Sequence, residues 1–133
     1  MCNGKKSITG TCGTCHNTPN VGNNSTGAFM NIGVTAPDAP HLDTAPLPVF
    51  TVTCADNSQK VVTDLGRAMI TGQCSDIGKT KVPVLRALPG RSPYFHNGAA
   101  TEIETLIEFY NSRFQIGLTD DQKADLAAFL ESL

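Results

Sequence analysis

The sequence predicts a mainly α-helical fold in one domain, residues 1–133, with a long irregular, loop-rich insertion. Two stretches near the C-terminal end, 101–110 and 119–133, place apolar residues at helical spacing. Residues 17–48 instead combine Asn, Gly and Thr with closely spaced prolines, a composition typical of loops. The chain has six Phe, two Tyr and no Trp, so its own side chains provide only a small core.

Local signals predict where the individual elements begin and end. Both C-terminal helices open with a capping-box pattern, which is formed by Thr101 with Glu104 and by Thr119 with Gln122. Between the loop and these helices, residues 50–53 and 61–63 predict a weak hairpin. Residues 64–70 predict a short helix that ends at Gly72.

The most specific pattern is the pentapeptide Cys12-Gly13-Thr14-Cys15-His16. Two cysteines separated by two residues and followed directly by histidine are the pattern of covalent c-type haem attachment. The two thiols would bond the vinyl groups of one porphyrin, and His16 would bind the iron as proximal ligand. Half of a zinc site and a dithiol redox pair are the alternatives. They have less support, because the remaining Cys and His residues are scattered singly and a turn follows the motif.

The net charge of the chain and the composition of its segments indicate which binding partners and which cellular compartment to expect. The formal net charge of -2, without a basic block, indicates neither a nucleic acid nor an anionic membrane surface as partner. No apolar run reaches membrane-spanning length, and no signal sequence is recognisable at the start. Since covalent haem attachment normally follows export, we expect a periplasmic or extracellular protein, present here as a mature form or a fragment.

The other cysteines also favour an oxidising compartment. We predict a disulfide between Cys54 and Cys74, which would stabilise the loop between them by about 3 kcal/mol; two buried free thiols are the alternative. Cys2 is left over and is most simply a free thiol, although a lipid-bearing or intermolecular cysteine is also compatible with its position.

Six sequence blocks together resemble one known family. They are residues 12–22, 64–67 (Asp-Leu-Gly-Arg), 81–86 (Lys-Val-Pro-Val-Leu-Arg), 92–98 (Ser-Pro-Tyr-Phe-His-Asn-Gly), 109–111 (Phe-Tyr-Asn) and the final helix from 118 (Leu-Thr-Asp). In this order they resemble the C-terminal haem domain of the bacterial di-haem cytochrome c peroxidase and MauG superfamily. The resemblance implies a cytochrome c-like haem domain. Full members carry two haem domains, whereas this chain has one C-x-x-C-H motif.

The second axial ligand of the iron separates an electron carrier from a catalyst, because a Met or His ligand closes the site and a weak ligand leaves it open. Tyr110 stands fourteen residues after His96, where the superfamily places a methionine or a tyrosine ligand. Met69 is the alternative, although the superfamily has no ligand in that segment. His96 and His41 are weaker candidates, and each of these side chains also has an ordinary structural interpretation.

The resemblance also implies residues that contact the haem. Tyr94, Phe95 and His96 belong to a loop that resembles a haem-adjacent loop of the superfamily, with His96 as a hydrogen-bonding group. Arg86 and Arg91 are candidates to pair with haem propionates, because a guanidinium group matches a carboxylate. The superfamily's interdomain calcium uses backbone carbonyls near Arg91 and Pro93 together with a side chain of the other domain, so calcium has little support here.

These observations lead to one main function and two alternatives. We expect a monohaem c-type cytochrome domain that transfers electrons to a redox partner protein or a second haem domain. A haem peroxidase of the cytochrome c peroxidase/MauG type is the enzymatic alternative, and it requires a weak or absent ligand at Tyr110. A homo-oligomeric assembly with stacked haems is the third.

Overall fold

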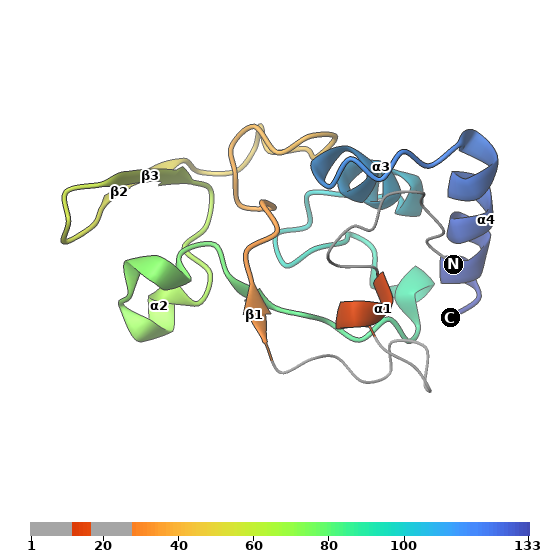
Figure 1. Ribbon diagram of the computed structural model, residues 1–133, viewed down its shortest axis with the longest axis horizontal. Coiled ribbons are helices and arrows are strands. Elements are labelled where there is room, and N and C mark those ends of the chain that lie inside the picture. The colour runs from red at the N-terminus through yellow and green to blue at the C-terminus, as the bar shows by residue number, and fades with distance from the viewer. Residues whose placement is uncertain (1–11, 17–27) are drawn as a thin grey trace.

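The computed structural model describes residues 12–16 and 28–133, which form short helices and strands joined by irregular segments (Figure 1). The α-helices are α1 (Cys12–Cys15), α2 (Ala68–Thr71), α3 (Ile103–Arg113) and α4 (Asp120–Glu131). Two 3-10 helices are η1 (Cys74–Asp76) and η2 (Leu88–Arg91). The strands are β1 (Phe29–Met30), β2 (Phe50–Thr53), β3 (Gln59–Val62) and β4 (Thr80–Lys81). Cys2 and the part of the predicted loop at 17–27 lie outside the described residues.

The prediction of a mainly α-helical fold is wrong, because the fold is mixed and loop-rich, with 34% helix and 13% strand among the described residues. The helix expected at 64–70 illustrates the reason. Gly66 takes a positive φ of 56°, and its N–H donates to Asp64 Oδ1 at 2.6 Å, so the chain turns there and only the single turn of α2 remains helical. That turn does end at Gly72, which takes the left-handed conformation at the C-cap.

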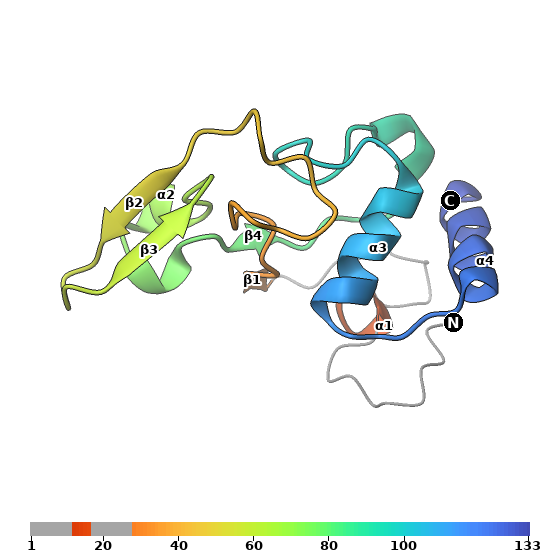
Figure 2. The same ribbon diagram turned by 90° about the horizontal axis from the view of Figure 1, so that it is seen from above.

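Helices α3 and α4 agree most closely with the sequence, and they lie side by side (Figure 2). Their shared core consists of Leu88, Tyr94, Ala100, Ile103, Ile107, Ala127 and Leu130. The capping box of α4 is confirmed, since Gln122 N donates to Thr119 Oγ1 at 3.3 Å and Thr119 N donates to Gln122 Oε1 at 3.0 Å. The box expected at Thr101 is wrong, because Glu102 is the N-cap of α3 and makes no side-chain cap. Within the described ranges, no helix is long and apolar enough to cross a membrane.

The described strands form two small antiparallel sheets. The predicted hairpin is confirmed by β2 and β3, which pair from Phe50 with Val62 to Thr53 with Gln59, and it projects from the end of the molecule opposite α4 (Figure 1). Strand β1 pairs with β4, so Phe29 lies opposite Lys81. This pairing joins the segment that follows the haem motif to the segment that leads to η2 (Figure 2).

The predicted disulfide between Cys54 and Cys74 is confirmed, with Cα atoms 5.8 Å apart. It packs with Val62 and Ile77 in a small core beneath the hairpin. Because it closes a loop with a sequence separation of 20, changing both cysteines to serine should lower the free energy of unfolding by about 3 kcal/mol, measured by urea denaturation. Dithiothreitol should destabilise the wild type similarly and leave the double variant unchanged. Equal stability of the two proteins under oxidising conditions would contradict this.

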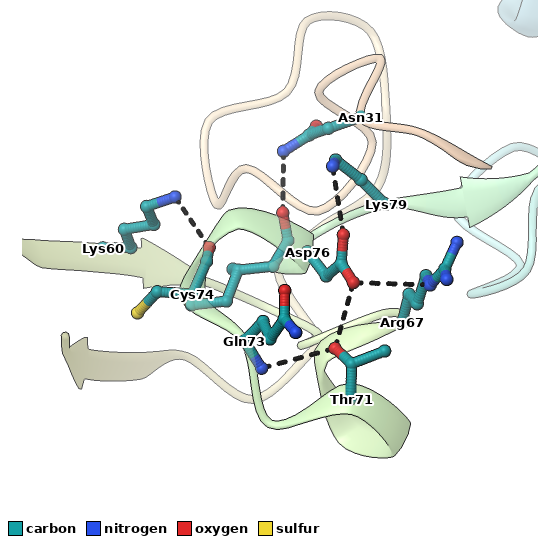
Figure 3. Close-up of polar contacts among 9 residues, drawn as sticks. Asn31, Lys60, Arg67, Thr71, Gln73, Cys74, Asp76 and Lys79 are labelled. Carbon is teal, nitrogen blue, oxygen red and sulfur yellow. Dashed lines mark hydrogen bonds and ion pairs between the residues drawn. The ribbon is translucent and has the colours of Figure 1, made fainter. Parts of the chain in front are cut away.

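A buried carboxylate, Asp76, organises the segment between α2 and β4 (Figure 3). Its Oδ1 accepts from Lys79 Nζ at 3.0 Å, and its Oδ2 accepts from Thr71 Oγ1 at 3.0 Å and pairs with Arg67 Nε at 3.3 Å. The neighbouring carbonyl of Ile77 accepts from Asn31 Nδ2 at 3.1 Å, which ties this network to the end of β1. The Asp76 carboxylate thus fixes the side chains of Lys79, Arg67 and Thr71.

These contacts make the fold sensitive to acid. The hydrogen bond from Lys79, followed by that from Thr71 and the charges of Lys79 and Arg67, lowers the pKa of Asp76 below its ordinary value. A carboxyl group whose pKa is lowered in the folded state stabilises the fold above its unfolded pKa, and this stabilisation disappears as the pH falls through the folded pKa. We therefore expect stability to fall through the acidic range below the ordinary Asp pKa.

The Asp76→Asn variant should be less stable than the wild type at neutral pH and should lose part of this pH dependence, as measured by thermal unfolding at a series of pH values. The matched control is Asp38→Asn, since Asp38 is exposed. If the stability of the Asp76→Asn variant depended on pH as that of the wild type does, the Asp76 carboxylate would not be the source of this pH dependence.

Candidate haem site

The haem motif forms the single helical turn α1, in which His16 N donates to the Cys12 carbonyl at 2.8 Å. Cys12 is exposed, whereas Cys15 and His16 are half-buried. The turn therefore presents two accessible thiols one helical turn apart and an imidazole that points into less solvated surroundings. This is the donor set that the attachment of one porphyrin requires.

The environment of His16 keeps its imidazole neutral. Burial lowers the pKa of His16, and the nearby Pro83 carbonyl opposes this only in part. His16 Nδ1 is buried and has no hydrogen-bond partner among residues 12–16 and 28–133. A neutral imidazole is the form that binds a metal, so His16 fits the role of an iron ligand.

Tyr110 of α3 is brought close to the motif from almost a hundred residues further along the chain. Burial, with a smaller contribution from the charges of Cys12 and Cys15, raises the pKa of Tyr110 to about 12. Part of the side chain reaches solvent, while desolvation by burial is the largest cause of the raised pKa. Tyr110 therefore lies at the haem motif as a neutral phenol.

Three phenylalanines surround the Tyr110 ring. Phe109 meets it edge to face with a centroid distance of 5.4 Å, and Phe95 lies at 6.2 Å. Phe114 stacks on it at 5.9 Å with planes inclined by 19°. These rings form an apolar wall, which we call the aromatic cluster (Phe95, Phe109, Tyr110 and Phe114).

Met30 is a residue that the sequence interpretation missed. Its Sδ lies 3.5 Å from Cys15 Sγ, because β1 follows the motif and runs past α1. The only available signal was the position of Met30 fourteen residues after His16, which is not specific. Met30 thus adds a polarisable thioether beside the attachment cysteine.

The other candidate iron ligands are found elsewhere in the structure. Met69 is on α2 with 72% of its surface exposed, and α2 is separated from α1 in both views (Figures 1 and 2). His41 Nε2 lies 2.8 Å from Ser112 Oγ on the surface. His96 Nε2 lies 3.4 Å from Asp64 Oδ1, which engages the ring in a surface ion pair. None of the three arrangements favours an iron ligand.

The predicted haem-contact residues divide into a buried and an exposed group. Tyr94 is in the core of α3 and α4, and Phe95 is in the aromatic cluster. Arg86 and Arg91 are both exposed and have no carboxylate partner among the described residues; Arg91 Nη1 donates to the Val84 carbonyl at 3.0 Å. Within the same described part, no three His, Cys, Asp or Glu side chains gather as a metal site, so the zinc alternative gains no support there.

Comparisons with known proteins identify relatives of this chain. No family model matches the chain. The chain is 34% identical over 137 residues to cytochrome-c peroxidase IdrP2 of Denitromonas iodatirespirans, covering 93% of this chain and 36% of that protein. It is 30% identical to cytochrome c551 peroxidase of Nitrosomonas europaea, covering 92% of this chain and 30% of that protein.

A solved structure is similar as well. It is a MauG-like protein associated with microbial copper homeostasis, which superposes with a TM-score of 0.64 and 25% identity over 92% of this chain and 39% of the other. The chain therefore spans about a third of the length of the curated relatives that it matches.

Proposed function

The chain is a domain of the cytochrome c peroxidase/MauG superfamily, and from this premise we propose that it binds one haem c and serves peroxide-dependent redox chemistry. The observation that carries the proposal is the position of Tyr110, a buried neutral phenol beside Cys12 and Cys15. A neutral phenol would leave the iron accessible to peroxide, whereas a methionine or histidine ligand would block it.

Cys12, Cys15 and His16 would hold the haem. The two thiols would form the thioether bonds, and the neutral imidazole of His16 would bind iron on one side. His16 is suited to this role because its burial disfavours the protonated form, in which neither ring nitrogen is available. When bound, haem supplies an iron that changes oxidation state and reacts with peroxide.

Tyr110 would determine how accessible the haem iron is to peroxide. Tyrosine binds iron well as a phenolate, but the pKa of about 12 keeps Tyr110 protonated at physiological pH. A protonated phenol is a weak ligand and a good hydrogen-bond donor. We infer that Tyr110, as a neutral phenol, would leave the haem pocket accessible to peroxide and would donate a hydrogen bond to a peroxide held there.

Other residues would complete the pocket. The aromatic cluster would exclude water from the face of Tyr110. Arg86 and Arg91, which lack a carboxylate partner in the described part, would be available to the propionates. Electrons would come from a redox partner protein or from a second haem domain. The Cys54–Cys74 disulfide supports an exported, oxidising location for this chemistry.

Electron transfer by this haem domain is the second candidate, and the C-x-x-C-H motif is compatible with it because a covalently held haem can exchange electrons. It would require a strong second axial ligand, which none of Met69, His41 and His96 offers in its present position.

Absorption spectra of the purified haem-bound chain would separate the two candidates. Our proposal predicts a high-spin ferric spectrum, a rapid change on addition of hydrogen peroxide, and ready binding of carbon monoxide after reduction. It also predicts that peroxide is consumed when a reduced cytochrome is supplied as electron donor. A low-spin spectrum that is indifferent to both ligands would overturn the proposal and leave the electron carrier.

A further inference from the structure

Phe114 has a position that the proposed function does not explain. It lies just beyond the C-terminal end of α3 with 36% of its surface exposed, where an apolar ring gains less from burial than in the core. Nevertheless it is stacked almost parallel on Tyr110, with centroids 5.9 Å apart and planes inclined by 19°. Aromatic pairs at this separation attract each other beyond their buried area, so Phe114 restricts the orientation of the Tyr110 ring.

Phe114 is itself held by its neighbour Arg113. The guanidinium group lies over the Phe114 ring at 5.7 Å, and Arg113 Nε donates to the Ile32 carbonyl at 3.1 Å. The adjacent Gly33 gives room for this contact, because a Cβ there would lie 2.7 Å from Arg113 Nε. Gly33 also takes a φ of 91°, which other residues rarely adopt.

These contacts form a continuous connection around the haem motif. Ile32 and Gly33 follow β1, and β1 carries Met30 beside Cys15. From there the connection runs through Arg113 and Phe114 to Tyr110, whose hydroxyl lies near the same cysteines. The end of α3 is thereby tied to the strand that passes the attachment turn, and Tyr110 is between them.

We propose that Phe114 is a positioning residue for Tyr110: its stacked ring, anchored by Arg113, holds the phenol at the haem pocket and shields it from water. This inference rests on the proposed place of Tyr110 in the haem pocket. Without the Phe114 ring, Tyr110 is free to tilt towards solvent, and water gains access to the position that the phenol occupies.

The test compares ferric absorption and electron paramagnetic resonance spectra of haem-bound variants. Tyr110→Phe defines the spectral change caused by loss of the hydroxyl. Phe114→Leu keeps apolar volume but removes the stacking ring, and Phe114→Tyr restores an aromatic ring. Phe129→Leu is the matched control, because Phe129 is another partly exposed phenylalanine, on α4, with 47% of its surface exposed.

We expect the spectrum of Phe114→Leu to shift in the direction of that of Tyr110→Phe. Phe114→Tyr and Phe129→Leu should both remain like the wild type. If Phe114→Leu folds poorly by thermal unfolding, Arg113→Gln provides a second variant that keeps both rings and should give a smaller shift in the same direction.

Three results would contradict the inference in different ways. A wild-type spectrum of Phe114→Leu, together with a changed spectrum of Tyr110→Phe, would overturn the role of Phe114 and leave the proposed function intact. Equal shifts in Phe114→Leu and Phe129→Leu would indicate general loosening and overturn it as well. An unchanged spectrum of Tyr110→Phe would overturn the proposed place of Tyr110, and the role of Phe114 with it.

Discussion

Replacing His16 with glycine is expected to remove the proximal ligand while the cysteines still hold the haem. In our proposal, covalent attachment would depend on Cys12 and Cys15, whereas the bond to iron would depend on the neutral imidazole of His16. The absorption spectrum of the reduced, carbon monoxide-bound variant should lose the signature of an axial imidazole. Free imidazole added to the variant should restore it, because the vacated space accepts the same ring.

The matched controls for this experiment are His41→Gly and His96→Gly, which change surface histidines engaged with Ser112 and Asp64. Both should keep the wild-type spectrum. An unchanged spectrum in the His16→Gly variant, or an equal change in either control, would mean that another group is the proximal ligand.

Replacing Phe109 with alanine is expected to cost the most stability of any single change that we consider, about 3–5 kcal/mol of unfolding free energy. Phe109 has no exposed surface and packs with Val34 and Ala39. It also meets Phe95 edge to face at 5.2 Å and Tyr110 at 5.4 Å. Its removal leaves a cavity beside Phe95 and Tyr110 in the aromatic cluster, which the surrounding loops can close only in part.

Urea denaturation of the Phe109→Ala variant measures this loss directly. The control is Phe50→Ala on β2, which removes the same ring from a site where 47% of the residue is exposed. The control should lose less stability, because about half of the Phe50 surface was already exposed to solvent before the change. Similar losses of unfolding free energy in the two variants would show that the buried Phe109 ring contributes no more to stability than the partly exposed Phe50 ring.

Local sequence signals predicted those parts of the fold that local physics determines. The capping box at Thr119 fixes the start of α4, and the left-handed Gly72 fixes the end of α2. The hairpin of β2 and β3 followed from its β-branched residues and turn, and the Cys54–Cys74 pairing from its loop length. Each of these features depends on residues close together in the chain.

The overall class was mispredicted because it depends on contacts between distant segments. A long irregular insertion in a helical protein was expected, yet among the described residues the segment between α1 and η2 contains the strands, the disulfide and the Asp76 network. The pairing of β1 with β4 joins segments fifty residues apart, and neither two-residue strand has a recognisable pattern of its own.

The candidate site also combines residues that local sequence identifies with residues that only contacts between distant segments reveal. The pentapeptide from Cys12 to His16 is recognisable from sequence alone, whereas Tyr110 was singled out by the resemblance to the superfamily, which implies a ligand at this distance after His96. Met30 and Phe114 were not found, because their relevance comes only from contacts with Cys15 and Tyr110. Ordinary apolar residues that surround a functional group carry no signal in a single sequence.

The most direct test of the account is the mass of the intact chain under denaturing conditions, after expression in a host that attaches c-type haem. We predict the mass of the polypeptide plus one haem, and the mass of the bare polypeptide when Cys12 and Cys15 are both changed to alanine. A matched variant with Cys54 and Cys74 changed to alanine should keep its haem. A wild-type chain that carries no covalent haem, or one that keeps it without Cys12 and Cys15, would contradict the account.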